Sequence, residues 1–152
     1  MSNILLLSIR PEYANKIFDR TKTVELRRVR PRLLNEGDRV VVYVSSPEKA
    51  VVGSFKVDNI VEKPITELWE EVEKIAGISP EEFYDYYQGV KVGVGIFLKD
   101  IHRFNQPVEL HRLRNKLPNL KPPQSFRYLT ANQFNIVNSL GERLTGTVAE
   151  KY

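Results

Sequence analysis

The sequence contains no cysteine and only two histidines, His102 and His111. Without cysteine, the chain can form no disulfide framework, no thiolate nucleophile and no cysteine-based zinc site. The histidines stand nine residues apart, which is not a metal-ligand spacing on one helix or strand, so we predict no metal site and no cofactor. The absence of cysteine is also compatible with the reducing cytoplasm, where we expect the protein to act.

Long hydrophobic runs are absent as well. No apolar stretch approaches the roughly 20 residues of a membrane helix, so we expect no membrane partner. The N-terminal stretch MSNILLLSIRPEY has no basic region before its short apolar run and no small-residue cleavage site, so it predicts a first strand and not a signal peptide. The length of 152 residues predicts a single domain over residues 1–152.

Charge is distributed unevenly along the chain, whose net charge is +4. Residues 10–39 carry nine Lys or Arg against five acids, and residues 99–128 carry seven against two. Residues 62–86, between them, carry eight acids against two lysines. If the basic segments meet in space, they form a positive face with an acidic back, which is typical of polyanion binding. The alternative is that these charges are solvated and only keep the protein in solution.

Apolar periodicity predicts strands and helices in mixed order. Strands are expected over residues 4–9, 22–28, 39–44, 48–64 and 90–101, and helices over residues 11–18, 66–77, 80–87 and 131–141. Thr66, Ser79 and Thr130 are predicted N-caps, while Gly77 and Gly141 are predicted helix stops. From Asn105 the chain is proline-rich, so little regular structure is expected beyond a short strand near residues 108–111. The tail from Thr145 is expected to fray. This order predicts an α+β fold, a small mixed or antiparallel β-barrel with flanking helices.

The segment from Lys22 to Arg27 combines strand alternation with charge. On a strand, Glu25 and Arg27 share one face, about 7 Å apart along the chain. An arginine binds phosphate through two parallel hydrogen bonds, and a carboxylate can accept a hydrogen bond from the exocyclic amine of a base. We therefore predict that these residues and Arg10 line a basic cleft for a base or nucleotide. The alternative is a structural ion pair of Glu25 with Arg27 or Arg10.

Other candidates for nucleic-acid binding follow strand ends or lie in the proline-rich region: Arg28, Ser45, Gln124 and Arg127. Arg28 is expected to contact phosphate, if it contacts the ligand at all. Gln124 and Arg127 belong to PPQSFRYLT, which is predicted to lie opposite the Lys22–Arg27 segment. The aromatic residues there, Phe126 and Tyr128, are interpreted as anchors to the core.

The stretch SIRPEYANKIFDRTKTVELRR resembles the ASCH domain family, relatives of the PUA-like barrels. The family pattern Lys-Thr-x-Glu-x-Arg is matched by Lys22, Thr23, Glu25 and Arg27, after the lead-in Ser8, Ile9 and Arg10. Three later stretches, LLNEGDRVVVY, AVVGSFKVDNI and VKVGVGIFLKDI, resemble the strands that follow in that family. The resemblance covers about residues 3–112 and leaves residues 113–152 as a C-terminal extension.

The resemblance implies a PUA-like barrel with a cleft for RNA or modified nucleotides. We therefore predict a nucleic-acid-binding module, with RNA or a nucleotide as the partner ahead of DNA.

One branch of the family deacetylates acetylcytidine with a lysine, a threonine three residues later and a distant glutamate. Lys22 matches the lysine, but Glu25 replaces the threonine. Other members are ribonucleases. The alternative is thus a nucleoside amidohydrolase or ribonuclease on the same cleft, with Lys22 and Glu25 as catalytic residues, although Glu25 is a weak base beside cations. A third possibility is a protein-interaction domain that uses the acidic helices. The sequence does not predict the oligomeric state.

Overall fold

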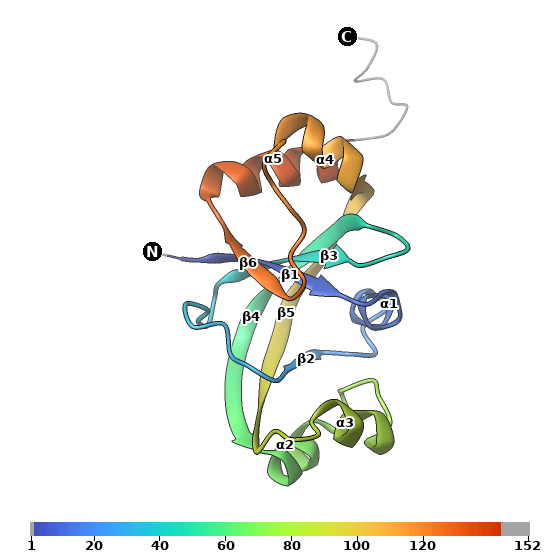
Figure 1. Ribbon diagram of the computed structural model, residues 1–152, viewed down its shortest axis with the longest axis vertical. Helices are drawn as coiled ribbons and strands as arrows, with labels where there is room; N and C mark the ends of the chain where they lie inside the picture. Colours follow the sequence, from blue (N-terminus) through green and yellow to red (C-terminus); the bar gives the residue numbers. More distant parts are fainter. Residues whose placement is uncertain (1, 144–152) are drawn as a thin grey trace.

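The computed structural model describes residues 2–143 (Figure 1), so the tail predicted to fray lies outside the described residues. The strands are β1 (Ile4–Ile9), β2 (Val24–Arg27), β3 (Arg39–Val44), β4 (Ala50–Pro64), β5 (Val92–Glu109) and β6 (Phe126–Leu129). The helices are α1 (Pro11–Phe18), α2 (Ile65–Val72), α3 (Pro80–Tyr86), α4 (Leu110–Lys116) and α5 (Ala131–Glu142). None of these helices is long and apolar enough to cross a membrane.

The six strands form one mixed sheet in the order β2-β5-β4-β3-β1-β6. β1 pairs with β3 in parallel, and every other pairing is antiparallel. The predicted α+β class and mixed sheet are therefore confirmed. Among the described residues no pairing joins the two edge strands, β2 and β6, so the sheet stays open along a seam between β2 and the β1–β6 pair.

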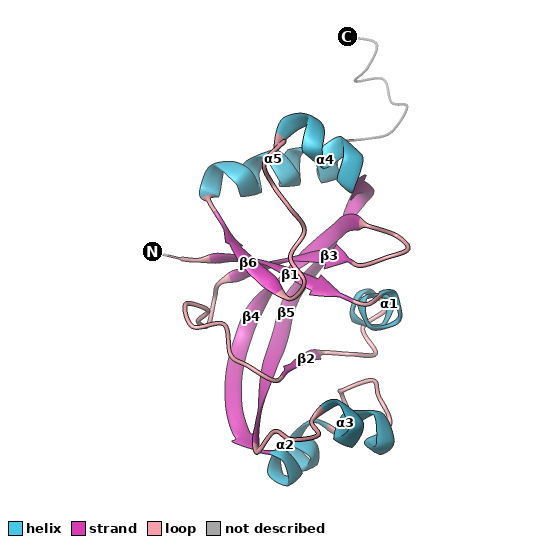
Figure 2. Ribbon diagram, in the orientation of Figure 1, coloured by secondary structure: helices cyan, strands magenta, loops and turns pink. Residues whose placement is uncertain are grey.

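Side-chain alternation on β1 divides the core between the two faces of the sheet. Leu5 and Leu7 enter one buried cluster with Ile17 of α1. Leu6 points the other way, into a second cluster beneath α4 and α5 with Leu113 and Val137. A third cluster packs β2 against α2 and α3 at the far ends of β4 and β5. Figure 2 shows the result: α4 and α5 lie at one end of the molecule, and α2 and α3 lie at the other.

The prediction of little regular structure after Asn105 is wrong. β5 continues to Glu109 and leads directly into α4, and β6 forms later in the same region. The register between β4 and β5 shifts between the pairs Gly53–Arg103 and Val51–Val108, so the residues around Pro107 lie outside the regular ladder. A proline is tolerated at such an irregularity because no ladder hydrogen bond is required of it.

The predicted N-caps of α3 and α5 are confirmed, but the predicted N-cap Thr66 and the predicted glycine stops are wrong. α2 begins at Ile65 after Pro64, so Thr66 lies inside the helix. Ser79 and Thr130 each form a capping box at the start of α3 and α5. α2 ends at Val72, before Gly77. Gly141 lies inside α5, where a Cβ atom would overlap the Phe104 ring of β5. That glycine permits a close approach of helix and sheet and does not end the helix.

Candidate functional site

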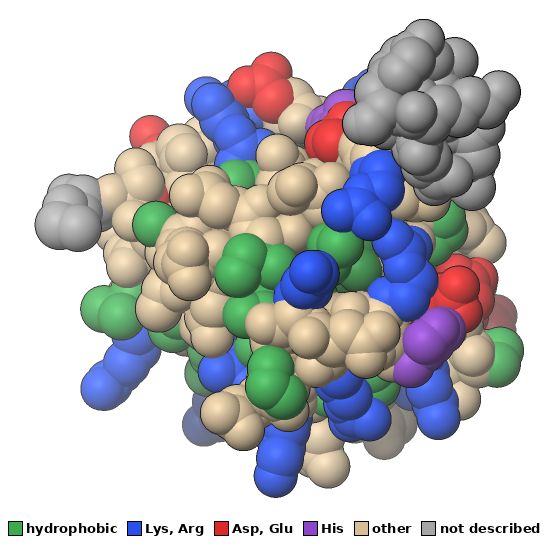
Figure 3. Space-filling model, turned by 90° about the horizontal axis from the view of Figure 1, so that it is seen from above, with side chains coloured by type: hydrophobic (Ala, Val, Ile, Leu, Met, Phe, Trp, Pro, Cys, Tyr) green, Lys and Arg blue, Asp and Glu red, His purple; other side chains and the backbone are tan. Residues whose placement is uncertain are grey.

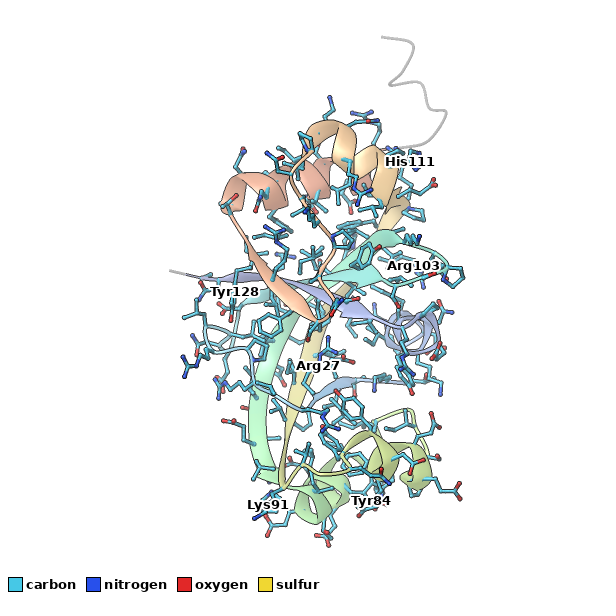
Figure 4. The ribbon with its side chains drawn as sticks, in the orientation of Figure 1. Arg27, Tyr84, Lys91, Arg103, His111 and Tyr128 are labelled. Atoms are coloured by element: carbon cyan, nitrogen blue, oxygen red, sulfur yellow. The ribbon has the colours of Figure 1, made fainter. Side chains whose placement is uncertain are left out.

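Arg27 bridges the seam between β2 and the β1–β6 pair (Figure 4). Its Nη2 donates hydrogen bonds to the carbonyl oxygens of Ser8, at 2.9 Å, and Ser125, at 3.3 Å. The amide of Ser8 also donates to the Ser125 oxygen at 2.8 Å. One side chain therefore links the strands where a closed barrel would have a backbone ladder.

A pocket of about 810 Å³ lies beside Arg27 in this seam. Its lining comes from β1, α1, β2 and α3 and from the loops beside them and beside β3 and β6. The lining residues are Ser8, Ile9, Arg10, Glu12, Tyr13, Lys22, Glu25, Leu26, Arg27, Ser45, Ile78, Glu82, Asp85, Tyr86 and Gln124. A volume in this range suits a small ligand the size of a nucleotide.

Two ionisable side chains are buried in the pocket wall, Lys22 at 2% exposure and Glu25 at 4%. The Nζ of Lys22 donates to the Ala76 carbonyl oxygen at 2.8 Å and lies 5.4 Å from the centre of the Tyr13 ring. Burial lowers the pKa of Lys22, and this effect outweighs the opposing attraction of Glu25. A lysine with a lowered pKa exchanges its proton more readily than an exposed one, as acid–base catalysis requires.

Glu25 and Arg27 lie side by side with unused hydrogen-bonding capacity. The ion pair of Glu25 with Arg27, which the sequence left open as the alternative, is present: the Nε of Arg27 lies 3.5 Å from Oε2 of Glu25. That Nε is buried without a hydrogen bond to any described residue. Within residues 2–143, no group donates a hydrogen bond to the Glu25 carboxylate. A buried donor without a partner costs free energy, so the Nε of Arg27 would gain from a polar ligand.

Side chains of α1 and α3 form another wall of the pocket. The Tyr13 hydroxyl donates to Oε2 of Glu82 at 3.3 Å, and the Tyr86 hydroxyl donates to the Leu26 carbonyl oxygen at 3.2 Å. Burial raises the pKa of both phenols, and the Glu82 carboxylate adds to the effect at Tyr13. Both tyrosines therefore keep their protons at neutral pH and act as donors.

The pocket is not the basic cleft that the sequence predicts. Its lining contains four carboxylates and three cations: Glu12, Glu25, Glu82 and Asp85, with Arg10, Lys22 and Arg27. The acidic helix α3, expected at the back of the molecule, borders the pocket instead. Acids favour the first turn of α3 because they complement the helix dipole, and the capping box ties Glu82 to that turn.

The structure brings most of the predicted binding residues together. Six line the pocket: Arg10, Lys22, Glu25, Arg27, Ser45 and Gln124. Arg28 and Arg127 do not. Arg28 donates to the Tyr86 carbonyl oxygen at 2.7 Å, and Arg127 donates to the Lys121 carbonyl oxygen at 3.4 Å. The neighbours of Arg127 on β6, Phe126 and Tyr128, pack against the first core cluster. Strand alternation therefore turns Arg127 to the opposite face of the sheet. The role of all eight in binding stays a prediction.

Sequence reasoning missed the pocket residues of α1 and α3, namely Tyr13, Glu82, Asp85 and Tyr86. A signal for the α3 residues was present, because positions 82, 85 and 86 share one helix face while Phe83 and Tyr87 are buried on another. What this pattern does not reveal is that the face meets Lys22, since that depends on tertiary packing.

The family model of the ASCH domain matches residues 7–106, about two thirds of the sequence. The chain belongs to the ASCH domain family. An ASCH domain-containing ribonuclease of Zymomonas mobilis is 31% identical to this ASCH protein over 135 residues, which is 89% of this chain and 90% of the relative. The crystal structure of ASCH from Zymomonas mobilis has a TM-score of 0.86 and 29% identity, and the match covers 93% of this chain and 97% of that one.

More distant solved structures share the fold alone. Human THYN1, solved in complex with DNA containing 5-methylcytosine, has a TM-score of 0.61 at 17% identity, over 93% of this chain and 99% of that one. Because the Zymomonas match covers 93% of this ASCH protein, it includes most of the C-terminal segment that the sequence resemblance left out.

Proposed function

We propose that this ASCH protein cleaves RNA and holds the reacting nucleotide in the seam pocket. The observation that carries the proposal is the buried ion pair of Glu25 and Arg27 in a pocket of nucleotide size, in which the Nε of Arg27 has no hydrogen-bond partner among the described residues. The similarity to the Zymomonas ribonuclease, at 31% identity, supports the class of reaction.

Cleavage by the ribose 2′-hydroxyl requires a proton acceptor, a donor to the phosphoryl oxygens and a proton for the leaving oxygen. Glu25 accepts the 2′-hydroxyl proton as the 2′-oxygen bonds to phosphorus. The Nε of Arg27 donates a hydrogen bond to a phosphoryl oxygen, where negative charge accumulates. As the bond from phosphorus to the 5′-oxygen breaks, Lys22 gives its proton to that oxygen. The products are a 2′,3′-cyclic phosphate and a free 5′-hydroxyl.

The test is cleavage of labelled single-stranded RNA by the wild-type protein and by Lys22→Met and Glu25→Gln. Each substitution removes one proton-transfer group, so we expect kcat/KM to fall by about 10²–10⁴-fold. The control is Arg32→Met, an exposed position outside the pocket lining. Single-stranded DNA, which has no 2′-hydroxyl, should remain intact. Wild-type rates in both pocket variants would overturn the proposal.

The pH profile provides a second readout of the same assignment. Lys22 must be protonated to serve as the acid, and its pKa is lowered by burial. Activity should therefore decline on the alkaline side at a pH below the ordinary lysine value of 10.5. Glu25→Gln should lower activity at every pH, whereas Arg32→Met should leave the profile unchanged.

A binding module without catalysis is the second candidate, favoured by the near balance of charge in the pocket. Four carboxylates and three cations suit an uncharged base better than a phosphate. In that case Glu25 accepts a hydrogen bond from an exocyclic amine. This candidate predicts RNA binding that Glu25→Gln weakens, with no product from RNA. Acetylcytidine, assayed in parallel, separates both readings from an amidohydrolase, since only the last releases acetate.

A further inference from the structure

We infer that an RNA strand held in the pocket leaves it over a basic surface at the α4 end of the molecule, and the inference rests on the proposed function. This α4 surface consists of Arg112, Arg114 and Lys116 on α4 with Lys121 and Arg127 beyond it. All five are exposed or half-buried. None of them lines the pocket, and their chemistry is that of a phosphate-binding track.

The charges around the pocket indicate on which side the RNA strand leaves it. Glu12, Glu82 and Asp85 come from the α1 and α3 side of the lining. On the β1 and β6 side the lining is cationic or neutral, with Arg10, Ser45 and Gln124. Phosphates are repelled from the acidic side, which leads on to the glutamates of α2. The chain of phosphates therefore leaves on the other side.

Two connecting segments join the pocket to the α4 surface over a short distance. Ser45 lines the pocket, and four residues later the Lys49 carbonyl oxygen accepts a hydrogen bond from the amide of Leu110, at the start of α4. Consecutive Cα atoms are about 3.8 Å apart, so Ser45 and Lys49 are separated by at most about 15 Å. By the same measure, Lys121 lies at most about 11 Å from Gln124, which lines the pocket.

The cations of the α4 surface have no acidic partner within residues 2–143. Among the described residues none of the five takes part in an ion pair, whereas Arg30 pairs with Glu62 and Lys63 with Glu71. Arg112 and Arg127 each bond only a carbonyl oxygen, which leaves their charge uncompensated. Figure 3, which looks onto this end, shows Lys and Arg side chains across the face and carboxylates at its edges. An uncompensated group of cations attracts a polyanion.

The ligand class follows from these contacts. Lys and Arg side chains on a convex helix meet phosphates and carry no information about base sequence. The α4 surface therefore adds affinity for longer single strands, independent of sequence, while the pocket handles one nucleotide.

The test compares a double charge reversal on the α4 surface, K116E/K121E, with the matched control K74E/K91E at the α2–α3 end. All four lysines are exposed, and both variants change the net charge equally. The probes are fluorescein-labelled 2′-O-methyl oligonucleotides of about 4 and about 16 nucleotides, which lack the 2′-hydroxyl nucleophile. Binding is measured by fluorescence anisotropy from about 50 to about 200 mM salt. Circular dichroism checks that each variant is folded.

We expect K116E/K121E to weaken binding of the longer probe on the order of tenfold at low salt and to reduce its salt slope by roughly 1.4. The shorter probe should bind as before, and K74E/K91E should leave both affinities unchanged. Any of four outcomes overturns the inference. In the first two, the control loses as much affinity as K116E/K121E, or K116E/K121E loses as much affinity for the short probe as for the long one. The other two are an unchanged affinity of K116E/K121E for the long probe and a wild type that does not bind the long probe. Failure of the proposed function gives a different result. If the wild type binds the long probe through the α4 surface but yields no product from RNA, the proposed cleavage is wrong and the α4 surface still binds RNA.

Discussion

At the scale of single residues, the decisive feature is a lysine and a glutamate that the fold buries together. Lys22 and Glu25 are 2% and 4% exposed in a chain where nearly all other charges reach solvent. Burying charge costs free energy unless it is fully paired. Because the Glu25 carboxylate accepts no hydrogen bond from the described residues, this cost is only partly offset in the free protein. Such an arrangement is typical of a site that is completed by its ligand.

Replacing Lys22 by methionine should separate function from stability. The pKa of Lys22 lies below 10.5, so between its folded pKa and 10.5 the folded state binds fewer protons than the unfolded state. The cost of burying the ammonium is then full below the folded pKa and disappears as the pH rises to 10.5. We expect Lys22→Met to be more stable than the wild type at neutral pH, with an advantage that shrinks towards pH 10.5, while cleavage is lost.

Thermal unfolding across this pH range provides the measurement, with the exposed Lys74→Met as the control that shows no such trend. If Lys22→Met were less stable at neutral pH, attraction to Glu25 would outweigh desolvation, and the sign of the argument would be wrong.

At the scale of elements, close packing of α5 against β5 holds the C-terminal segment to the sheet. Gly141 faces the ring of Phe104, which leaves no room for a Cβ atom. On the same helix, Val137 and Leu140 are buried in the second core cluster. The capping box of Thr130 with Gln133 fixes where the helix begins. α5 thus depends on a local capping box at its N-terminus and on close packing against β5.

Gly141→Ala should destabilise the protein although alanine is the better helix former. The added methyl group must displace Phe104 or shift α5, which costs about 1–3 kcal/mol in a packed core. Urea unfolding measures the loss, and the exposed Ser139→Ala on the same helix should cost nothing or stabilise slightly. Equal stability of Gly141→Ala and the wild type would mean that the helix can move away from β5 without cost.

At the scale of the whole molecule, segments distant in sequence complete the sheet and its cores. β6 pairs with β1, joining Ile4–Leu7 to Phe126–Leu129. The second core cluster draws its buried aliphatic residues from both halves of the chain; those beyond residue 112 are Leu113, Leu120, Leu129, Val137 and Leu140. The C-terminal segment is therefore part of the packing and also supplies four of the five cations of the α4 surface.

Truncation after residue 112 should leave a chain that does not fold. It removes β6 and five buried aliphatic side chains worth about 1.5–3 kcal/mol each, a total comparable with the stability of a whole domain. The measurement is circular dichroism with thermal melting. Truncation after residue 143, which keeps every described contact, is the control and should melt cooperatively. A cooperative transition in the shorter chain would show that residues 113–152 are dispensable.

What the sequence determined by itself is local. Alternation at 22–28 places Glu25 and Arg27 on the face opposite Val24 and Leu26, and Ser79 and Thr130 begin their helices through neighbours three residues away. These features depend on backbone geometry over a few residues, which side-chain pattern encodes directly.

Only the tertiary structure decided the rest. β6 is a short proline-flanked segment that becomes a strand because β1 offers an edge, and α3 brings carboxylates to a pocket that local charge predicted to be basic. The open seam, which Arg27 bridges, has no local signature either. Each of these depends on contacts between residues far apart in the chain, and the free energy of such contacts is settled only when the whole sheet assembles.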